Sequence, residues 1–469
     1  MNPNSTIRGS GRWALAGLST TMLAPALATS IANVALPTLA KAFDAPFQSV
    51  QWVVLAYLLA ITALIVGVGR LGDIIGPRRL LLGGIGLFTA ASALCGLSPT
   101  LELLIAARAA QGLGAAVMMA LAMALVGETV GKTRTGSAMG LLGTMSAIGT
   151  TLGPALGGAL IAGFGWRAVF LINVPLGLIG LMLAAATLPP DRQAGDGPIA
   201  RFDIVGTGLL ALALAAYALA MTLGRGRFGP LNLMLLAAAG VAAAAFVLGQ
   251  RRSAAPLLPP AMFGDPALNG SLAANVLVST VMMATLVVGP FYLSGALGLD
   301  PARVGLVMAA GPLVAALAGV PAGRLVDRFG APPLVVAGLA GMAAGLVALS
   351  SALFAIAGYV GAIAAVTASY ALFQAANNTA VMAERRPGQR GVVSGLLSLS
   401  RNLGLITGAS VMGAIFALAS GAADVGAASP SAVAIGMRST FIVAAALVFV
   451  ALAVTMAGRD SSRRMAAAR

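Results

Sequence analysis

The strongest constraint on this chain is a series of long apolar runs, separated by short segments that hold most of the charges. A helix needs about 20 apolar residues to cross a bilayer. Runs of that length predict fourteen transmembrane helices, at roughly 13–36, 50–70, 80–97, 101–126, 136–162, 168–188, 203–223, 231–250, 268–293, 303–322, 333–352, 355–376, 392–419 and 437–457. We therefore expect an all-α membrane protein.

Composition narrows the function classes. Of the 469 residues, 59% are hydrophobic and only 9% are charged, too few charges for a water-exposed surface. The single cysteine, Cys95, excludes a disulfide framework, and the absence of histidine excludes zinc chemistry and imidazole acid–base catalysis. We expect no metal, no cofactor and no enzyme activity. The net charge of +15 is scattered through short loops, which favours membrane topology over nucleic-acid binding.

One short pattern occurs twice. The residues Gly69, Arg70, Leu71, Asp73 and Gly76 reappear 254 residues later, as Gly323, Arg324, Leu325, Asp327 and Gly330. The first copy follows the second predicted helix and the second copy follows the tenth. Such a repeat predicts two six-helix bundles related by a pseudo-twofold axis along the membrane normal, with two accessory helices between them. The expected segments are 13–188, 203–250 and 268–457, followed by a cytoplasmic tail at 458–469.

Lysines and arginines outside the predicted helices are distributed unequally between the two sides. Twenty fall on the side that holds both termini and six on the other. Because positive loops stay in the cytoplasm, both termini are expected there.

Four stretches have motif character, the first copy of the repeat and three others. They are Gly69-Arg-Leu71-Gly-Asp73-Ile-Ile-Gly76-Pro-Arg78, Arg108-Ala-Ala-Gln111-Gly112-Leu-Gly114, Gly149-Thr-Thr-Leu-Gly153-Pro154-Ala-Leu-Gly157-Gly158 and Trp166-Arg167 with Phe170-Leu-Ile-Asn173-Val-Pro175-Leu-Gly177. Together they resemble the motifs of the major facilitator superfamily, in its fourteen-helix drug/proton antiporter branch.

The resemblance implies a secondary active transporter in the bacterial inner (plasma) membrane. Such a protein exports small amphipathic molecules by alternating access, coupled to protons, and we expect it to act as a monomer in the lipid bilayer. No ATP-binding P-loop is present in the sequence.

The repeated turn is expected to form a cytoplasmic latch that closes in one conformation and opens in the other. Its residues are Gly69, Arg70, Asp73, Gly76 and Arg78 in the first copy, with Arg324 and Asp327 in the second. Asp73 can face the positive N-terminal end of a neighbouring helix, and the arginines can bind carboxylates or lipid phosphates. The alternative is a topology anchor, in which the cations only hold the loop on one side.

Charges within a membrane span are costly and usually functional. Arg108, with Gln111 in the same motif, and Arg401 lie inside predicted helices, and Glu128 is among the carboxylates nearest the membrane. We assign these residues to transport or coupling. For Arg108 the alternative is a guanidinium that only bonds backbone carbonyls, and for Arg401 it is a side chain that extends to the interface.

Glycines at steps of four form one face of the fifth predicted helix: Gly149, Gly153, Gly157 and the adjacent Gly158, with a bend expected at Pro154. We expect this antiporter glycine face to lie where the two halves rock, although static packing is compatible with it. Candidate residues for a substrate cavity are Thr29, Asn33, Tyr57, Met118, Asn275, Tyr292, Gln374 and Asn378.

One departure from the family pattern concerns the cargo. The stretch from Leu27 to Pro37 resembles a motif that usually has an aspartate at its second position, which here is Ala28. Two arginines inside the predicted spans, Arg108 and Arg401, without a mid-membrane carboxylate favour an alternative: an exporter or facilitator of a neutral or anionic metabolite, without classical proton antiport. A transporter-like sensor is a third interpretation, which the two retained copies of the turn disfavour.

Overall fold

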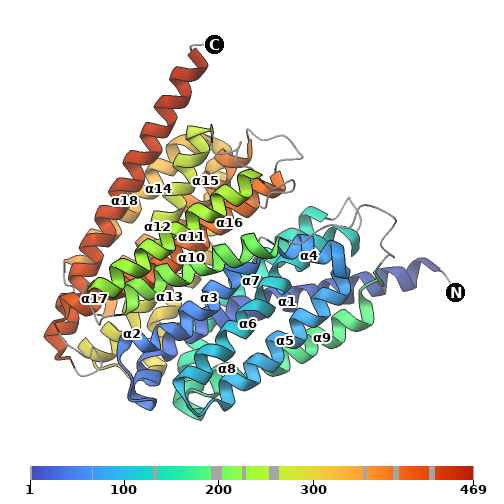
Figure 1. Ribbon diagram of the computed structural model, residues 1–469, viewed down its shortest axis with the longest axis horizontal. Coiled ribbons are helices and arrows are strands. Elements are labelled where there is room, and N and C mark those ends of the chain that lie inside the picture. Colours follow the sequence, from blue (N-terminus) through green and yellow to red (C-terminus); the bar gives the residue numbers. More distant parts are fainter. Residues whose placement is uncertain are drawn as a thin grey trace.

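The computed structural model describes residues 3–65, 67–129, 135–191, 203–223, 229–252, 264–351, 356–383, 390–421 and 428–467. These residues form helices and short connections, and fourteen helical segments are long and apolar enough to cross a membrane. The predicted number of spans is therefore confirmed. Because this number is even, the chain begins and ends on the same side of the bundle, which we call the terminus side; the opposite side is the far side (Figure 1).

The helices fall into three groups along the chain. The N-terminal half contains α1 (Pro3–Ala42), α2 (Phe47–Val50), α3 (Trp52–Ile65), α4 (Val68–Ile75), α5 (Pro77–Leu97), α6 (Leu101–Thr129), α7 (Thr135–Phe164), α8 (Ala168–Leu171) and α9 (Asn173–Thr187). The accessory pair is α10 (Ile204–Thr222) and α11 (Pro230–Arg252). The C-terminal half contains α12 (Pro266–Phe291), the π-helical turn η2 (Tyr292–Ala296), α13 (Pro301–Phe329), α14 (Ala331–Ser350), α15 (Ile356–Ala383), α16 (Arg390–Thr407), the π-helical turn η4 (Gly408–Met412), α17 (Gly413–Ala419) and α18 (Pro430–Ala467).

Several helices are longer than the sequence predicted. α1 continues through Pro37 to Ala42, although proline removes one hydrogen bond of the helix ladder. α18 extends to Ala467, so residues 458–467 of the predicted tail continue this helix. Hydropathy marks only the apolar part of a helix, so a polar extension beyond the membrane leaves no such signal.

The two halves repeat one packing pattern. In the N-terminal half α1 packs against α7 and α9, and α6 packs against α3 and α5. In the C-terminal half α12 packs against α16 and α18, and α15 packs against α13 and α14. Each of these four contacts in one half has its counterpart in the other, as expected for a duplicated bundle.

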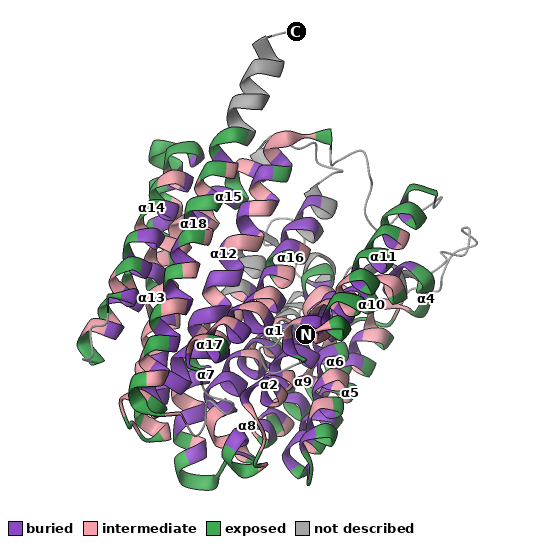
Figure 2. Cartoon of the chain, turned by 60° about the vertical axis from the view of Figure 1, so that its left-hand side comes forward, coloured by how far each residue is buried: buried purple, intermediate pink, exposed green. Residues whose placement is uncertain are grey.

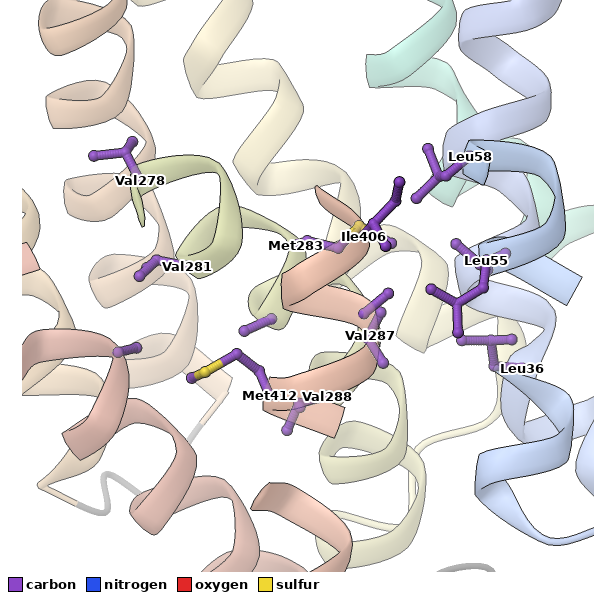
Figure 3. Close-up of a cluster of buried hydrophobic side chains, with 14 of the residues drawn as sticks. Leu36, Leu55, Leu58, Val278, Val281, Met283, Val287, Val288, Ile406 and Met412 are labelled. Carbon is purple, nitrogen blue, oxygen red and sulfur yellow. The ribbon is translucent and has the colours of Figure 1, made fainter. Parts of the chain in front are cut away.

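The buried side chains form two separate cores. The larger core combines almost the whole C-terminal half with the far-side part of the N-terminal half, and Figure 3 shows Leu36, Leu55 and Leu58 beside Ile406 and Val287. The smaller core, which includes Leu18, Ile61 and Leu121, belongs only to the terminus side of the N-terminal half. The halves thus share apolar packing on the far side, and in Figure 1 they diverge toward the terminus side.

Three aromatic rings join the halves on the far side. Phe47 lies edge-on to Phe291, with ring centroids 4.6 Å apart, and the Phe416 centroid is 5.7 Å from Phe47. Such edge-to-face contacts stabilise packing beyond simple burial. Close by in sequence, Nε2 of Gln51 donates a 2.9 Å hydrogen bond to the carbonyl of Ala409 in η4. These contacts close the far side.

Candidate transport site

The repeated turns are shorter than predicted, because most of each repeat is helical. Residues 68–75 form α4, and the turn itself is Gly76, at φ 99°. In the second copy α13 runs to Phe329, and the turn is Gly330, at φ 80°. Only glycine adopts such positive φ angles without strain, so the paired glycines explain where each helix stops. Predicting a tight turn over the whole repeat was wrong.

A carboxylate that sequence reasoning missed anchors the first turn. The backbone N–H groups of Arg78 and Arg79 donate hydrogen bonds of 2.7 and 3.0 Å to the carboxylate of Asp191, just beyond α9. Nε of Arg79 is 4.0 Å from the same group, and Nη2 of Arg78 donates to the carbonyl of Ala185. A Cβ atom on Gly76 would lie 2.5 Å from Oδ2 of Asp191, so glycine is also required for this close approach. The first turn of α5 is thus capped by an acid from its own half.

The remaining latch residues are placed by their helices. Gly69, Arg70 and Asp73 lie on α4, and the side chains of Arg70 and Asp73 are outside the described part of the structure. Arg324 and Asp327 are exposed in the last turns of α13. In this conformation the described contacts of Arg78 and Arg79 stay within the N-terminal half, and the latch between the halves remains a prediction.

Arg108 is the centre of a buried polar cluster in the N-terminal half. Its side chain is fully buried, although it carries a charge. Nε donates to the carbonyl of Val53 on α3 at 2.8 Å, and Nη1 donates to the carbonyl of Ala28 on α1 at 3.3 Å. Nη1 also donates to Oε1 of Gln111, one turn along α6. The guanidinium carbon lies 4.0 Å from the centroid of the Tyr57 ring, within cation–π range.

Gln111 extends this cluster to a fourth helix. Its Nε2 donates a 2.7 Å hydrogen bond to Oγ of Ser92 on α5. Arg108 and Gln111 therefore connect α6 to α1, α3 and α5. Arg108 does bond backbone carbonyls, as the alternative interpretation expected, yet Nη2 is buried without a hydrogen-bond partner among the described residues. The N–H groups of Nη2 in this buried guanidinium therefore have unused hydrogen-bonding capacity.

Other predicted residues join this cluster around α1. The hydroxyls of Thr29 and Tyr57 both donate to the carbonyl of Pro25, at 2.8 and 3.0 Å. Nδ2 of Asn33 donates to the carbonyl of Thr29, and its Oδ1 is buried without a partner among the described residues. Five of the predicted site residues, Arg108 and Gln111 included, thus lie in or next to the buried polar cluster of the N-terminal half.

The other predicted residues lie elsewhere. Met118 is 1% exposed and belongs to the smaller core, which indicates packing. Asn275 donates to Oγ of Ser400 and to a carbonyl of α16. Tyr292 stacks on Tyr359 with ring centroids 5.9 Å apart, on the far side. The structure does not bring these three to the Arg108 cluster.

The remaining candidates on the terminus side of the C-terminal half, Gln374, Asn378 and Arg401, differ in how far they are exposed. Gln374 is half-buried: its Nε2 donates to the Tyr370 hydroxyl, and its Oε1 has no partner among the described residues. Asn378 and Arg401 are exposed, so Arg401 differs from Arg108 in the one property that suggested a shared role. The side chain of Glu128 lies outside the described residues.

The glycine face is divided between two neighbours. Gly149, Gly153 and Gly157 pack against α1 in the same half, where added Cβ atoms would meet Leu23, Ser30 and Ile31. Gly158 alone contacts the other half: an added Cβ atom there would lie 2.5 Å from the carbonyl oxygen of Pro301 and 2.9 Å from Cα of Gly305. The expectation that the whole face lies between the halves does not match this placement, because steps of four residues keep to one stripe and α1 fills that stripe.

Gly305, the partner of Gly158, was not predicted. It lies in α13, and the two glycines bring the backbones of α7 and α13 together near the far side. Two turns deeper, Oγ1 of Thr151 donates a 3.0 Å hydrogen bond to the carbonyl of Pro312. Nothing in sequence spacing pairs Gly158 with Gly305, since the contact depends on how the two bundles meet.

Titratable groups are sparse within the spans. Inside the span bounds the carboxylates are Glu102 and Asp327, each within three residues of a span end. Among the described residues no three histidine, cysteine, aspartate or glutamate side chains are close enough to hold a metal ion. The buried chemistry of this site is therefore a cation, amides and hydroxyls.

Comparison with known proteins adds the family. The profile of the Major Facilitator Superfamily matches residues 18–249 and 271–467. The riboflavin transporter RibZ of Clostridioides difficile is 30% identical over 429 residues, which cover 91% of this chain and 93% of RibZ. The multidrug resistance protein Stp of Mycobacterium tuberculosis is 33% identical over 82% of this chain and 72% of its own length. The drug efflux pump JefA of the same species is 34% identical over 84% of this chain and 78% of JefA.

Solved structures agree on the fold. A bacterial homologue of the human lysosomal transporter Spinster, in an inward-facing and occupied conformation, superposes with a TM-score of 0.70 at 16% identity, covering 96% of this chain and 97% of that one. A mutant of the nucleoside transporter NupG gives a TM-score of 0.68 at 13% identity, over 95% of this chain and 99% of that one. With fourteen membrane spans and these relatives, the chain is a small-molecule transporter and not an enzyme, and it belongs to the Major Facilitator Superfamily.

Proposed function

We propose that this chain exports small amphipathic molecules from a bacterial cell by alternating access, driven by proton exchange. The observation that carries the proposal is the division of the core: the halves share packing on the far side, whereas the terminus side of the N-terminal half has a core of its own. A carrier that rocks between two states needs contacts of this kind, closed on one side and separable on the other.

The direction of transport depends on which side of the bundle faces the cytoplasm. Twenty of the lysines and arginines outside the spans fall on the terminus side, which supports a cytoplasmic location for both termini and for the diverging ends of the two bundles. The conformation described above is then inward-facing, with the far side facing the cell exterior. The names of Stp and JefA support drug-like cargo.

A second candidate is the export of a neutral or anionic metabolite without proton antiport. The specific observation that favours it is Arg108 itself: its Nη1 bonds the backbone carbonyl of Ala28 instead of a carboxylate, and its Nη2 has no partner among the described residues. A buried guanidinium with a free donor attracts anions and repels cations. RibZ, whose name states that it transports riboflavin, is a relative with one defined metabolite as cargo.

Export assays in inverted membrane vesicles test both candidates. A panel of lipophilic cations, neutral compounds and organic anions is offered with and without a proton ionophore. Cation export that the ionophore abolishes supports the first candidate, and anion export that survives the ionophore supports the second. Absence of transport for the whole panel, with normal membrane insertion, contradicts both.

The residue at position 28 separates the candidates further. Ala28→Asp introduces a carboxylate beside Arg108, with Ala28→Asn as the control of similar size. If the missing carboxylate sets the cargo, the aspartate variant gains cation export relative to the asparagine variant, and it loses anion export. Equal behaviour of the two variants excludes this role for position 28.

A further inference from the structure

The accessory helix α10 lies over one of the two seams between the halves. It packs along α3 of the N-terminal half and touches η4 of the C-terminal half, while α11 packs against its outer face. In Figure 1 the pair, drawn in green, crosses the molecule between α3 and α16. Figure 2 shows α11 as one of the most exposed helices. The position of α10 thus gives it access to both halves.

One side-chain hydrogen bond connects α10 to each half. Nε1 of Trp52, at the start of α3, donates to Oγ1 of Thr222 at 3.0 Å. The hydroxyl of Tyr217 donates to Oγ1 of Thr407, the last residue of α16, at 3.3 Å. Each threonine also donates to a carbonyl of its own helix, Thr222 to Ala218 and Thr407 to Leu403. The two contacts are therefore of the same kind: the side chain of an aromatic residue donates to a threonine hydroxyl, which itself donates to a carbonyl of its own helix.

The two seams between the halves differ in construction. At the α7–α13 seam, Gly158 and Gly305 bring the backbones into direct contact. At the α3–η4 seam fewer residues approach one another, and the side chain of Gln51 reaches across to the carbonyl of Ala409. η4 is a π-helical turn, a feature that often marks a functional site because it interrupts the regular hydrogen-bond ladder. The seam with the weaker contact is the one that α10 covers.

We propose that α10 is a strap that travels with the N-terminal half and releases the C-terminal half, by breaking the Tyr217–Thr407 contact, when the far side opens. This inference rests on the alternating access proposed above. When α3 and η4 separate, a rigid α10 cannot keep both of its hydrogen bonds. The packing of α10 along α3 is larger than its contact with η4, so the bond to Thr407 is the one that breaks. In the closed state that bond stabilises the far-side seal.

Matched threonine substitutions test the strap without knowledge of the cargo. In a Cys95→Ala background, Ala409→Cys places a thiol at a fully buried position of the seam. Its labelling by a water-soluble maleimide reports how often the far side opens. Thr407→Val removes the acceptor for Tyr217 and should speed labelling about threefold to tenfold, the effect of losing one hydrogen bond. Thr222→Val removes the matching acceptor for Trp52 and should leave the rate unchanged.

Tyr217→Phe removes only the donor hydroxyl and should reproduce the Thr407→Val rate. If Thr222→Val speeds labelling as much as Thr407→Val, α10 does not stay with the N-terminal half. If neither threonine substitution changes the rate, the contacts do not hold the seam. Either result overturns the strap, whatever the export assay shows.

Cross-linking gives the second readout. A short bifunctional thiol reagent joins Trp52→Cys to Thr222→Cys in one variant and Tyr217→Cys to Thr407→Cys in another; a direct disulfide is too short, because an aromatic side chain fills each gap. Export of ethidium should survive the first cross-link and stop with the second. Survival of export with both cross-links, or loss with the first alone, contradicts the proposal. An absence of ethidium export before any cross-linking counts against the proposed function and leaves the labelling test of the strap intact.

Discussion

At the scale of single residues, Arg108 is the most informative position. Burying a charged side chain away from water costs on the order of several kcal/mol unless hydrogen bonds replace its hydration. Here the replacements come from the backbones of α1 and α3 and from Gln111, with the Tyr57 ring over one face of the guanidinium. Arg108 and Gln111 together thus connect four helices, and Nη2 of Arg108 is buried without a hydrogen-bond partner among the described residues.

Arg108→Lys tests whether geometry or charge matters. Lysine keeps the charge but lacks the planar fork that reaches Val53, Ala28 and Gln111 together. We expect export to fall at least tenfold and the melting temperature in detergent to drop, because buried carbonyls lose their donors at about 1–3 kcal/mol each. Arg401→Lys, at an exposed position, is the matched control and should stay close to wild type. Normal export by Arg108→Lys would show that only the charge is needed.

The second residue-scale prediction concerns Asp191. Two of its contacts are backbone N–H groups at the start of α5, and the third is a 4.0 Å ion pair to an arginine that is 79% exposed. Exposed ion pairs contribute little, so capping should dominate. Asp191→Asn keeps one of the two acceptor oxygens and should lose less stability than Asp191→Ala, which should lose about 1 kcal/mol. The denaturant midpoint in detergent distinguishes them, and equal losses in the two variants would assign the effect to charge.

Sequence reasoning found Arg108 and missed Asp191 for a physical reason. A charge inside an apolar run is conspicuous, because the membrane makes it costly. Asp191 lies in a polar linker where carboxylates are ordinary, and which helix start it caps depends on the packing of α5 against α9. The capping role of Asp191 depends on the tertiary fold, which the sequence pattern alone does not reveal.

At the scale of elements, α7 carries glycines with two different neighbours: Gly153 packs against α1 in the same half, and Gly158 packs against α13 in the other half. Gly158→Ala should push α7 and α13 apart, because its Cβ would lie 2.5 Å from the Pro301 oxygen. We expect more frequent far-side opening, measured as faster labelling of Ala409→Cys, and reduced export. Gly163→Ala on the same helix has no atom within 4 Å of the added Cβ and is the matched control. Equal labelling rates for the two variants would contradict a role for Gly158 in the seam.

Gly153→Ala should behave differently. Its Cβ would collide with the side chain of Ser30 within the N-terminal half, so the cost falls on folding. Overpacking of this kind costs about 1–3 kcal/mol. We expect a lower melting temperature and an unchanged rate of labelling at Ala409→Cys. A change in labelling as large as that of Gly158→Ala would place Gly153 in the moving seam.

The elements themselves were largely predictable. Fourteen apolar runs gave fourteen spans, because the membrane demands length and apolarity of every crossing segment. The repeats were expected to be turns, whereas the chain stays helical until Gly76 in the first copy and Gly330 in the second. The seam contacts of Gln51, Gly305 and Tyr217 had no linear signal at all.

At the scale of the whole molecule, the halves are alike in packing and unlike in chemistry. The same helix neighbours recur in each half, yet the buried cation and its cluster occur in the N-terminal half among the described residues. One half thus carries the buried cation, while the proposed alternating access requires both halves to move. The shared far-side core and the separate terminus-side core describe one of the two states that such motion requires.

The central claim is that the halves move as bodies, so that one side closes as the other opens. Spin-label distances measure this directly in a Cys95→Ala background. Labels on Ile75 and Phe329 report the terminus side, and labels on Phe164 and Leu418 report the far side; all four residues are exposed. Compared with the parent, Gly158→Ala should lengthen the far-side distance and shorten the terminus-side distance. A longer far-side distance with an unchanged terminus-side distance would contradict rocking and indicate local opening only.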